Sequence, residues 1–107
     1  MNKEERLKKL LDWEARKPDD AFLKYAIAQE FVSIKDDENA RIYFELLMNK
    51  FPDYLATYYQ YAKLLERYGK ITDAQNIYLA GITVAKTKDD NKTMRELNEA
   101  LMMLQDE

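Results

Sequence analysis

The sequence matches itself at an offset of 34 residues. A fixed period of this length indicates stacked supersecondary units, each of which buries its apolar face against a neighbour. This register therefore restricts the fold more strongly than any local propensity does. The pairs that share it are Pro18 with Pro52, Tyr25 with Tyr59, Ala28 with Ala62, Ala40 with Ala74, and Phe44 with Tyr78.

Within each unit, the apolar residues follow the period of two α-helices. A short polar segment separates the helices, SIKDDE in the first unit and RYGKIT in the second. Gly69 is predicted to adopt the left-handed conformation that ends a helix, and Lys35 occupies the same slot. The chain contains only two Gly and two Pro, which argues against an all-β fold with its many turns. The sequence thus predicts two helix pairs.

These residues resemble the tetratricopeptide repeat, whose pattern places aromatic, small and proline residues at fixed positions. Two positions depart from that pattern: Lys24 stands in an aromatic slot, and Lys86 stands in the proline slot of the second unit. The residues that carry the resemblance are Ile27, Ala28, Phe31, Ala40, Phe44 and Pro52 in the first unit, and Tyr58, Tyr61, Ala62, Leu65, Ala74 and Tyr78 in the second.

The resemblance implies an all-α fold in which antiparallel helix pairs stack as a short right-handed α-solenoid. We expect one domain over residues 1–107, with repeats at 21–54 and 55–88. An N-terminal capping helix is expected within 1–20 and a C-terminal one within 89–107, because about three repeats are needed for a stable stack.

The tyrosines divide into two groups. Tyr58, Tyr61 and Tyr78 share stripes with apolar residues and are predicted to fill the core. Tyr25 and Tyr59 lie on more polar stripes, and the first helix of each repeat lines a concave groove in the family that this sequence resembles. The alternative is that both rings lie under the C-terminal helix. The residues predicted to line the groove are Phe22, Tyr25, Gln29, Val32, Tyr59, Lys63 and Arg67.

The composition excludes several kinds of catalytic site. The chain has no Cys and no His, and Ser33 is its only serine, so it cannot form a Ser/His/Asp or Cys/His arrangement. The adjacent acids at 19–20, 36–37 and 89–90 precede predicted helices, where carboxylates cap free N–H groups. We therefore predict that the protein is not an enzyme and that it has no cofactor and no metal site.

We predict that the protein is a non-catalytic scaffold that binds another protein or peptide in the groove. The alternative is self-assembly, for example as a homodimer, through the groove or the C-terminal helix. Met102 and Met103 exceed what the core stripe of that helix requires and favour this alternative. The sequence does not identify the partner.

The charge pattern excludes other partners. No long run of one sign marks a nucleic-acid footprint, and no stretch has the length of a membrane span. The charged start of the chain is unlike a signal peptide, so a cytoplasmic location is expected. Trp13 is predicted to pack on the first repeat and cover its end, rather than to anchor the first helix at a membrane surface.

Overall fold

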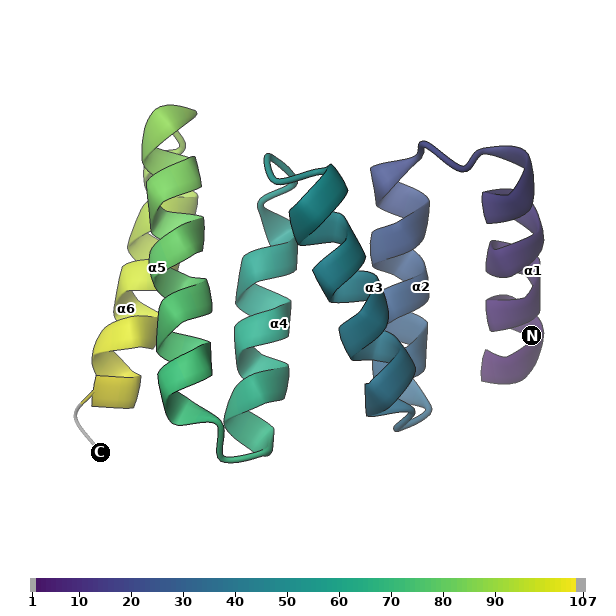
Figure 1. Cartoon of the computed structure of the whole chain (residues 1–107), viewed down its shortest axis with the longest axis horizontal. Helices are drawn as coiled ribbons and strands as arrows, with labels where there is room; N and C mark the ends of the chain where they lie inside the picture. The colour runs from purple at the N-terminus through teal and green to yellow at the C-terminus, as the bar shows by residue number, and fades with distance from the viewer. Residues whose placement is uncertain (1, 106–107) are drawn as a thin grey trace. The chain divides into compact units, whose positions relative to one another are not determined.

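The computed structural model describes residues 2–105, and this range contains six helices and no strand (Figure 1). The prediction of an all-α fold is confirmed. Met1 and residues 106–107, the outermost residues of the two predicted caps, lie outside the described residues. The helices are α1 (Lys3–Arg16), α2 (Ala21–Ser33), α3 (Asp37–Lys50), α4 (Ala56–Arg67), α5 (Ile71–Thr87) and α6 (Asn91–Gln105).

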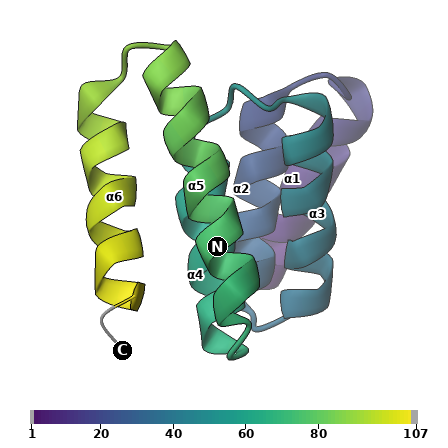
Figure 2. The same ribbon diagram turned by 60° about the vertical axis from the view of Figure 1, so that its left-hand side comes forward.

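The chain divides into two compact units, which are described separately. The first unit, Met1–Tyr54, contains α1, α2 and α3, and α2 packs against both of the others. The second unit, Leu55–Glu107, contains α4, α5 and α6, and here α5 packs against both neighbours (Figure 2). Each unit therefore has a central helix with one partner on either side.

Acidic side chains begin three of the helices. Asp20, Asp36 and Asp90 each accept a hydrogen bond from the backbone N–H of the residue three positions later, at 3.1, 3.3 and 3.0 Å. These bonds satisfy N–H groups that have no partner within a helix. The bonds from the Thr93 N–H and hydroxyl hold the pKa of Asp90 below its ordinary value. The prediction that the acid pairs act as helix caps is confirmed for these three residues.

The turns after α2, α4 and α5 each use left-handed backbone at one residue. Gly69 has φ of 72°, and Lys35 has φ of 63° at the equivalent position of the first unit, as the sequence predicted. Asp89 has φ of 56° in the turn before α6. A side chain is disfavoured in this conformation, so only Gly69 adopts it without steric cost.

The core of the first unit lies between α2 and α3. Ile27, Phe44 and Leu47 have no exposed surface, and neither do the small residues Ala28 and Ala40. Small residues beside large ones let packed helices interdigitate at close range. The 34-residue register therefore identified this core correctly.

A charged residue is also buried in the first unit. The side chain of Lys24 on α2 occupies the aromatic slot, yet Lys24 is only 6% exposed. Its ammonium lies 2.9 Å from Oε2 of Glu14 on α1, and the Tyr43 hydroxyl of α3 donates a hydrogen bond to Oε1 of the same carboxylate at 2.7 Å. Burial and this hydrogen bond raise the pKa of Tyr43. One carboxylate from α1 thus connects all three helices.

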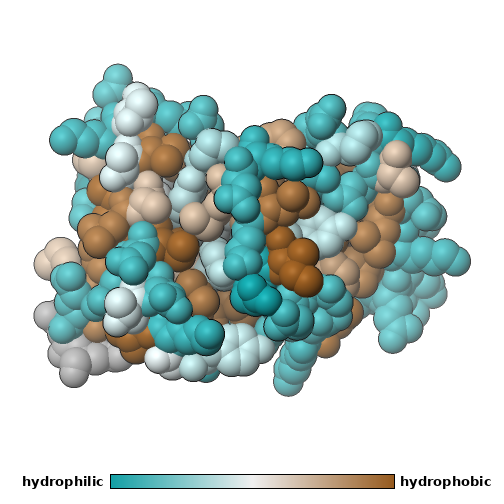
Figure 3. Space-filling view, viewed as in Figure 1, coloured by the Kyte–Doolittle hydropathy of each residue, from teal (hydrophilic) through white to brown (hydrophobic). Residues whose placement is uncertain are grey.

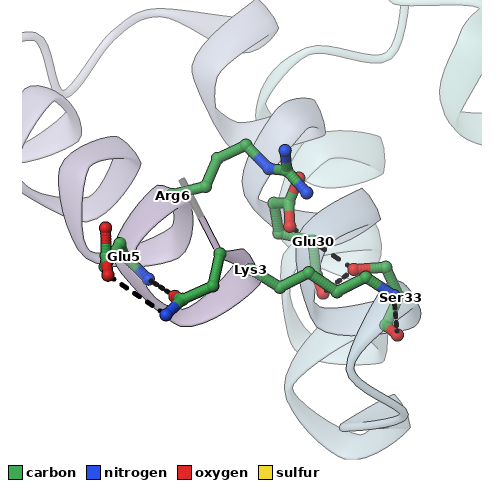
Figure 4. Close-up of polar contacts among 6 residues, drawn as sticks. Lys3, Glu5, Arg6, Glu30 and Ser33 are labelled. Atoms are coloured by element: carbon green, nitrogen blue, oxygen red, sulfur yellow. Dashed lines mark hydrogen bonds and ion pairs between the residues drawn. The ribbon is translucent and has the colours of Figure 1, made fainter.

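Helix α1 makes further polar contacts with α2. The guanidinium of Arg6 lies 2.6 Å from the Glu30 carboxylate, and the ammonium of Lys3 donates to the Ser33 carbonyl at 3.1 Å (Figure 4). Leu10 is the buried residue of α1. The surface near α1 is correspondingly hydrophilic at the right-hand edge of Figure 3. Polar contacts therefore carry much of the docking of this helix.

Trp13 departs from its prediction in part. Its side chain is half exposed, so it covers the end of the first repeat only partially. The indole lies on the wall of a pocket at the turn between α1 and α2. The sequence register placed Trp13 on the correct helix but did not reveal that opening.

The core of the second unit contains the predicted tyrosines. Tyr58, Tyr61 and Tyr78 are all buried, which confirms that they pack between helices. Helix α5 extends past Lys86 to Thr87, whereas α3 ends before Pro52. A proline cannot continue a helix, so its replacement by Lys86 is compatible with the greater length of α5.

Gly81 marks the closest approach within the second unit. A Cβ atom at this position would lie 2.7 Å from Cβ of Tyr58 and 3.0 Å from Cδ1 of Leu97. The first of these contacts involves an atom fixed to the backbone of α4, so a rotamer change cannot relieve it. The three helices of this unit pack together through a residue without a side chain.

We predict that Gly81→Ala destabilises the protein by roughly 1–2 kcal/mol. Overpacking costs about 1–3 kcal/mol, and the contact of 2.7 Å with a Cβ atom places this site in the upper half of that range. The better helix propensity of alanine offsets about 1 kcal/mol of the cost. The measurement is chemical denaturation, with Thr83→Ala on the exposed face of α5 as the control. A Gly81→Ala variant as stable as the wild type would contradict this packing.

Candidate functional site

The predicted groove residues of the first unit lie along α2. Their spacing of three or four positions places Phe22, Tyr25, Gln29 and Val32 on one side of the helix. Phe22 is 64% exposed, and the other three side chains are partly buried. An exposed phenylalanine on this side of α2 is a candidate contact for an apolar ligand.

Tyr25 does not stand alone on that surface. Its ring packs against Tyr54, with ring centroids 5.6 Å apart and planes tilted by 48°. Burial, and then the neighbouring Tyr54, raise the pKa of the Tyr25 hydroxyl. Burial and the negative charge of Asp20 raise the pKa of Tyr54. Both phenols are therefore neutral at physiological pH, and one side of the Tyr25 ring is already covered.

Sequence reasoning missed Tyr54. This residue lies in the turn after α3, outside the periodic stripes on which the groove prediction depended, and Asp20 occupies its slot in the preceding unit. The cluster of tyrosines in residues 51–70 was visible in the sequence, yet helical spacing assigns no direction to a ring in a turn.

Gln29, one turn after Tyr25 on α2, contributes an unusual polar group. Its side-chain oxygen Oε1 is buried and has no hydrogen-bond partner among the described residues. A buried acceptor without a partner costs free energy, typically about 1–3 kcal/mol. Such a group is satisfied when a donor from water or from a ligand reaches it.

The groove residues predicted in the second unit lie on α4. Tyr59, Lys63 and Arg67 follow one another at intervals of four positions and so share a side of the helix. The ammonium of Lys63 lies 5.4 Å from the centroid of the Tyr59 ring and 3.6 Å from the Glu66 carboxylate. Arg67 is exposed.

Tyr59 also packs against the core. Its ring meets the edge of Tyr78, with centroids 6.3 Å apart, and the Tyr78 hydroxyl donates to Glu66. Tyr59 is therefore half-buried, with a cation on one side and a core ring on another. The structure groups four of the seven predicted residues on α2 and three on α4, and their use as a single groove stays a prediction.

Other kinds of site have little support in residues 2–105. Within this range, no group of three or more His, Cys, Asp or Glu side chains could hold a metal ion. No helix there combines the length and the apolar character needed to cross a membrane.

Comparison with solved structures identifies the family. A tetratricopeptide repeat domain protein from Salinibacter ruber, solved by NMR, is 38% identical to this chain with a TM-score of 0.78. The match covers 81% of this chain and 88% of the other. This chain belongs to the tetratricopeptide repeat family. A crystal structure of a tetratricopeptide repeat domain protein from the same organism agrees, at 37% identity and a TM-score of 0.76 over 80% of this chain and 97% of that chain.

A third solved structure is similar in fold alone. The solution structure of a protein from Bordetella parapertussis is 18% identical, with a TM-score of 0.78 over 92% of this chain and 85% of that chain. Neither a scan against protein-family models nor a search of curated proteins gives a match. The tetratricopeptide repeat is typically a non-catalytic helical scaffold that mediates contacts between proteins, and the protein has this fold.

Proposed function

We propose that the protein is a non-catalytic scaffold that binds another polypeptide through the first helix of each repeat, α2 and α4. In this proposal residues 1–107 act as one domain, with 21–54 and 55–88 as its repeats. The observation that carries the proposal is the exposed Phe22 side chain on α2, three positions before Tyr25, whose ring pairs with Tyr54 of the turn after α3. Exposed aromatic groups on a rigid helix supply large contact area at low entropic cost.

The chemistry of these residues favours a peptide with apolar or aromatic side chains. Phe22 and the partly covered Tyr25 ring offer apolar surface to such a ligand. On α4, Lys63 and Glu66 already interact with each other, so Tyr59 remains the main apolar group of that side.

The tyrosines are less suitable than Phe22 for testing the proposal. Tyr25 packs on Tyr54 and Tyr59 packs on Tyr78, so replacing either ring with alanine removes a contact inside its unit. Such aromatic pairs contribute about 0.5–1.5 kcal/mol beyond their buried area. Replacing either tyrosine is therefore expected to lower stability, whereas the exposed Phe22 side chain has little buried area to lose.

We predict that Phe22→Ala lowers the affinity of the protein for its peptide ligand by about thirtyfold and leaves the melting temperature unchanged. An aromatic residue at the centre of an interface contributes about 2 kcal/mol or more. Peptides are selected on the wild-type protein from a random displayed library, and the dissociation constant of the best one is measured for each variant.

The matched control is Ile42→Ala, since Ile42 is an exposed apolar residue on α3 of the same unit. The control should bind the selected peptide as the wild type does. Equal affinity of Phe22→Ala and wild type, or an equal loss in the control, would reject α2 as the binding surface.

One observation favours a second function, self-assembly. Met102 and Met103 on α6 are 61% and 74% exposed, which leaves two large apolar side chains adjacent on the terminal helix. Exposed methionines are adaptable contacts for another protein surface.

Self-assembly predicts that the mass measured by sedimentation doubles with increasing protein concentration. The double variant Met102→Gln/Met103→Gln should remain a monomer over the same range because its apolar contact is lost. A wild-type protein that stays monomeric at the highest concentration would exclude this second function, and a variant that still dimerises would exclude α6 as the interface.

A further inference from the structure

A pocket opens at the turn between α1 and α2. Its volume is about 260 Å³, and its lining residues come from the last turn of α1, the connection and the first turn of α2. None of the seven predicted groove residues lines it. The lining residues are Trp13, Arg16, Lys17, Asp20 and Leu23.

Two of the walls are apolar. The indole of Trp13 is half exposed, and Leu23 is buried behind the opening. A partly exposed indole beside a fixed aliphatic side chain can cover one face of a small apolar group. The exposed part of the Trp13 side chain is therefore available to a ligand.

The charges of the pocket are unbalanced. No hydrogen bond or ion pair occupies the side chains of Arg16 and Lys17 within residues 2–105. The carboxylate of Asp20, by contrast, already accepts the N–H of Leu23 as the cap of α2. Two cationic residues of the lining are therefore exposed and without a partner among the described residues, while its one acid has a structural role. This arrangement favours an anion.

The size of the pocket limits the ligand. Sites for drug-sized molecules and cofactors usually enclose about 300–1,000 Å³. A volume of about 260 Å³ accommodates an apolar group about as large as one amino-acid side chain, together with one anionic group. Phosphate alone would satisfy the cations and leave Trp13 and Leu23 without a contact.

From these features we infer that the pocket binds a carboxylate joined to an apolar group of single-residue size. Arg16 and Lys17 bind the carboxylate, and Trp13 and Leu23 contact the apolar group. Two sources share this chemistry, a free aliphatic carboxylic acid and the last residue of a peptide. None of the lining residues is among those proposed to bind a polypeptide, so this inference does not depend on that function.

The fluorescence of Trp13 reports binding directly, because Trp13 is the only tryptophan in the chain. The probes are hexanoate, hexanol, a Gly-Ser peptide that ends in leucine with a free carboxylate, and the same peptide as its C-terminal amide. The full-length protein is titrated with each probe, and NMR amide shifts locate the site.

We expect a saturable change in Trp13 fluorescence with hexanoate or with the peptide acid. The neutral counterpart of the acid that binds, hexanol or the peptide amide, should bind at least about tenfold more weakly. Tighter binding of hexanoate identifies a free acid as the source, and tighter binding of the peptide acid identifies a chain end. The amide shifts should be centred on residues 13–23.

The variant Arg16→Gln/Lys17→Gln should lose the preference for the acids. The control Lys8→Gln/Lys9→Gln removes two exposed cations of α1 that lie outside the pocket. This control should keep the preference for the acids. The inference is overturned if neither acid binds, if hexanol and the amide bind as tightly as the acids, or if the Arg16/Lys17 variant retains the preference.

Discussion

The arrangement of the first unit depends on the Glu14 carboxylate. It accepts one contact from the buried ammonium of Lys24 on α2 and one from the hydroxyl of Tyr43 on α3, at 2.9 and 2.7 Å. Lys24 occupies a slot where the second repeat has a buried tyrosine, Tyr58, and where the family pattern has an aromatic residue. Because burying an unpaired charge is costly, Lys24 requires this partner from α1. An ion pair across helices here replaces an apolar contact.

The position of α1 decides which surfaces the unit presents. Leu10 is the buried residue of this helix, so Glu14, Arg6 and Lys3 hold it on α2 largely through polar contacts. Trp13 and Arg16 flank Glu14 on the same helix and reach the pocket at the α1–α2 turn only while α1 is docked there. The ion pair that satisfies Lys24 thus also fixes the walls of the second candidate site.

The sequence predicted those features that local spacing determines. Small residues such as Ala28 and Ala62 have the same role wherever two helices pack closely. Acids such as Asp20 have the same role wherever a helix begins. The sequence did not predict Tyr54 beside Tyr25, because a turn residue has no helical phase. It also did not predict the half-exposed Trp13 of α1, because helical spacing does not show where a neighbouring turn leaves an opening. The partner of Lys24 was also missed, since periodic spacing cannot choose which of several acids on another helix meets a buried cation.

The most direct test of this account is the coupling free energy between Lys24 and Glu14. Lys24→Met, Glu14→Gln and the double variant are unfolded with denaturant. The loss of unfolding free energy in the double variant is then compared with the sum of the losses in the two single variants. We predict that each single variant is destabilised. The loss in the double variant should be smaller than the sum of the single losses by about 1–3 kcal/mol, because removing both partners leaves no unpaired buried charge. Effects that add within about 0.5 kcal/mol would contradict the role of this ion pair in docking α1.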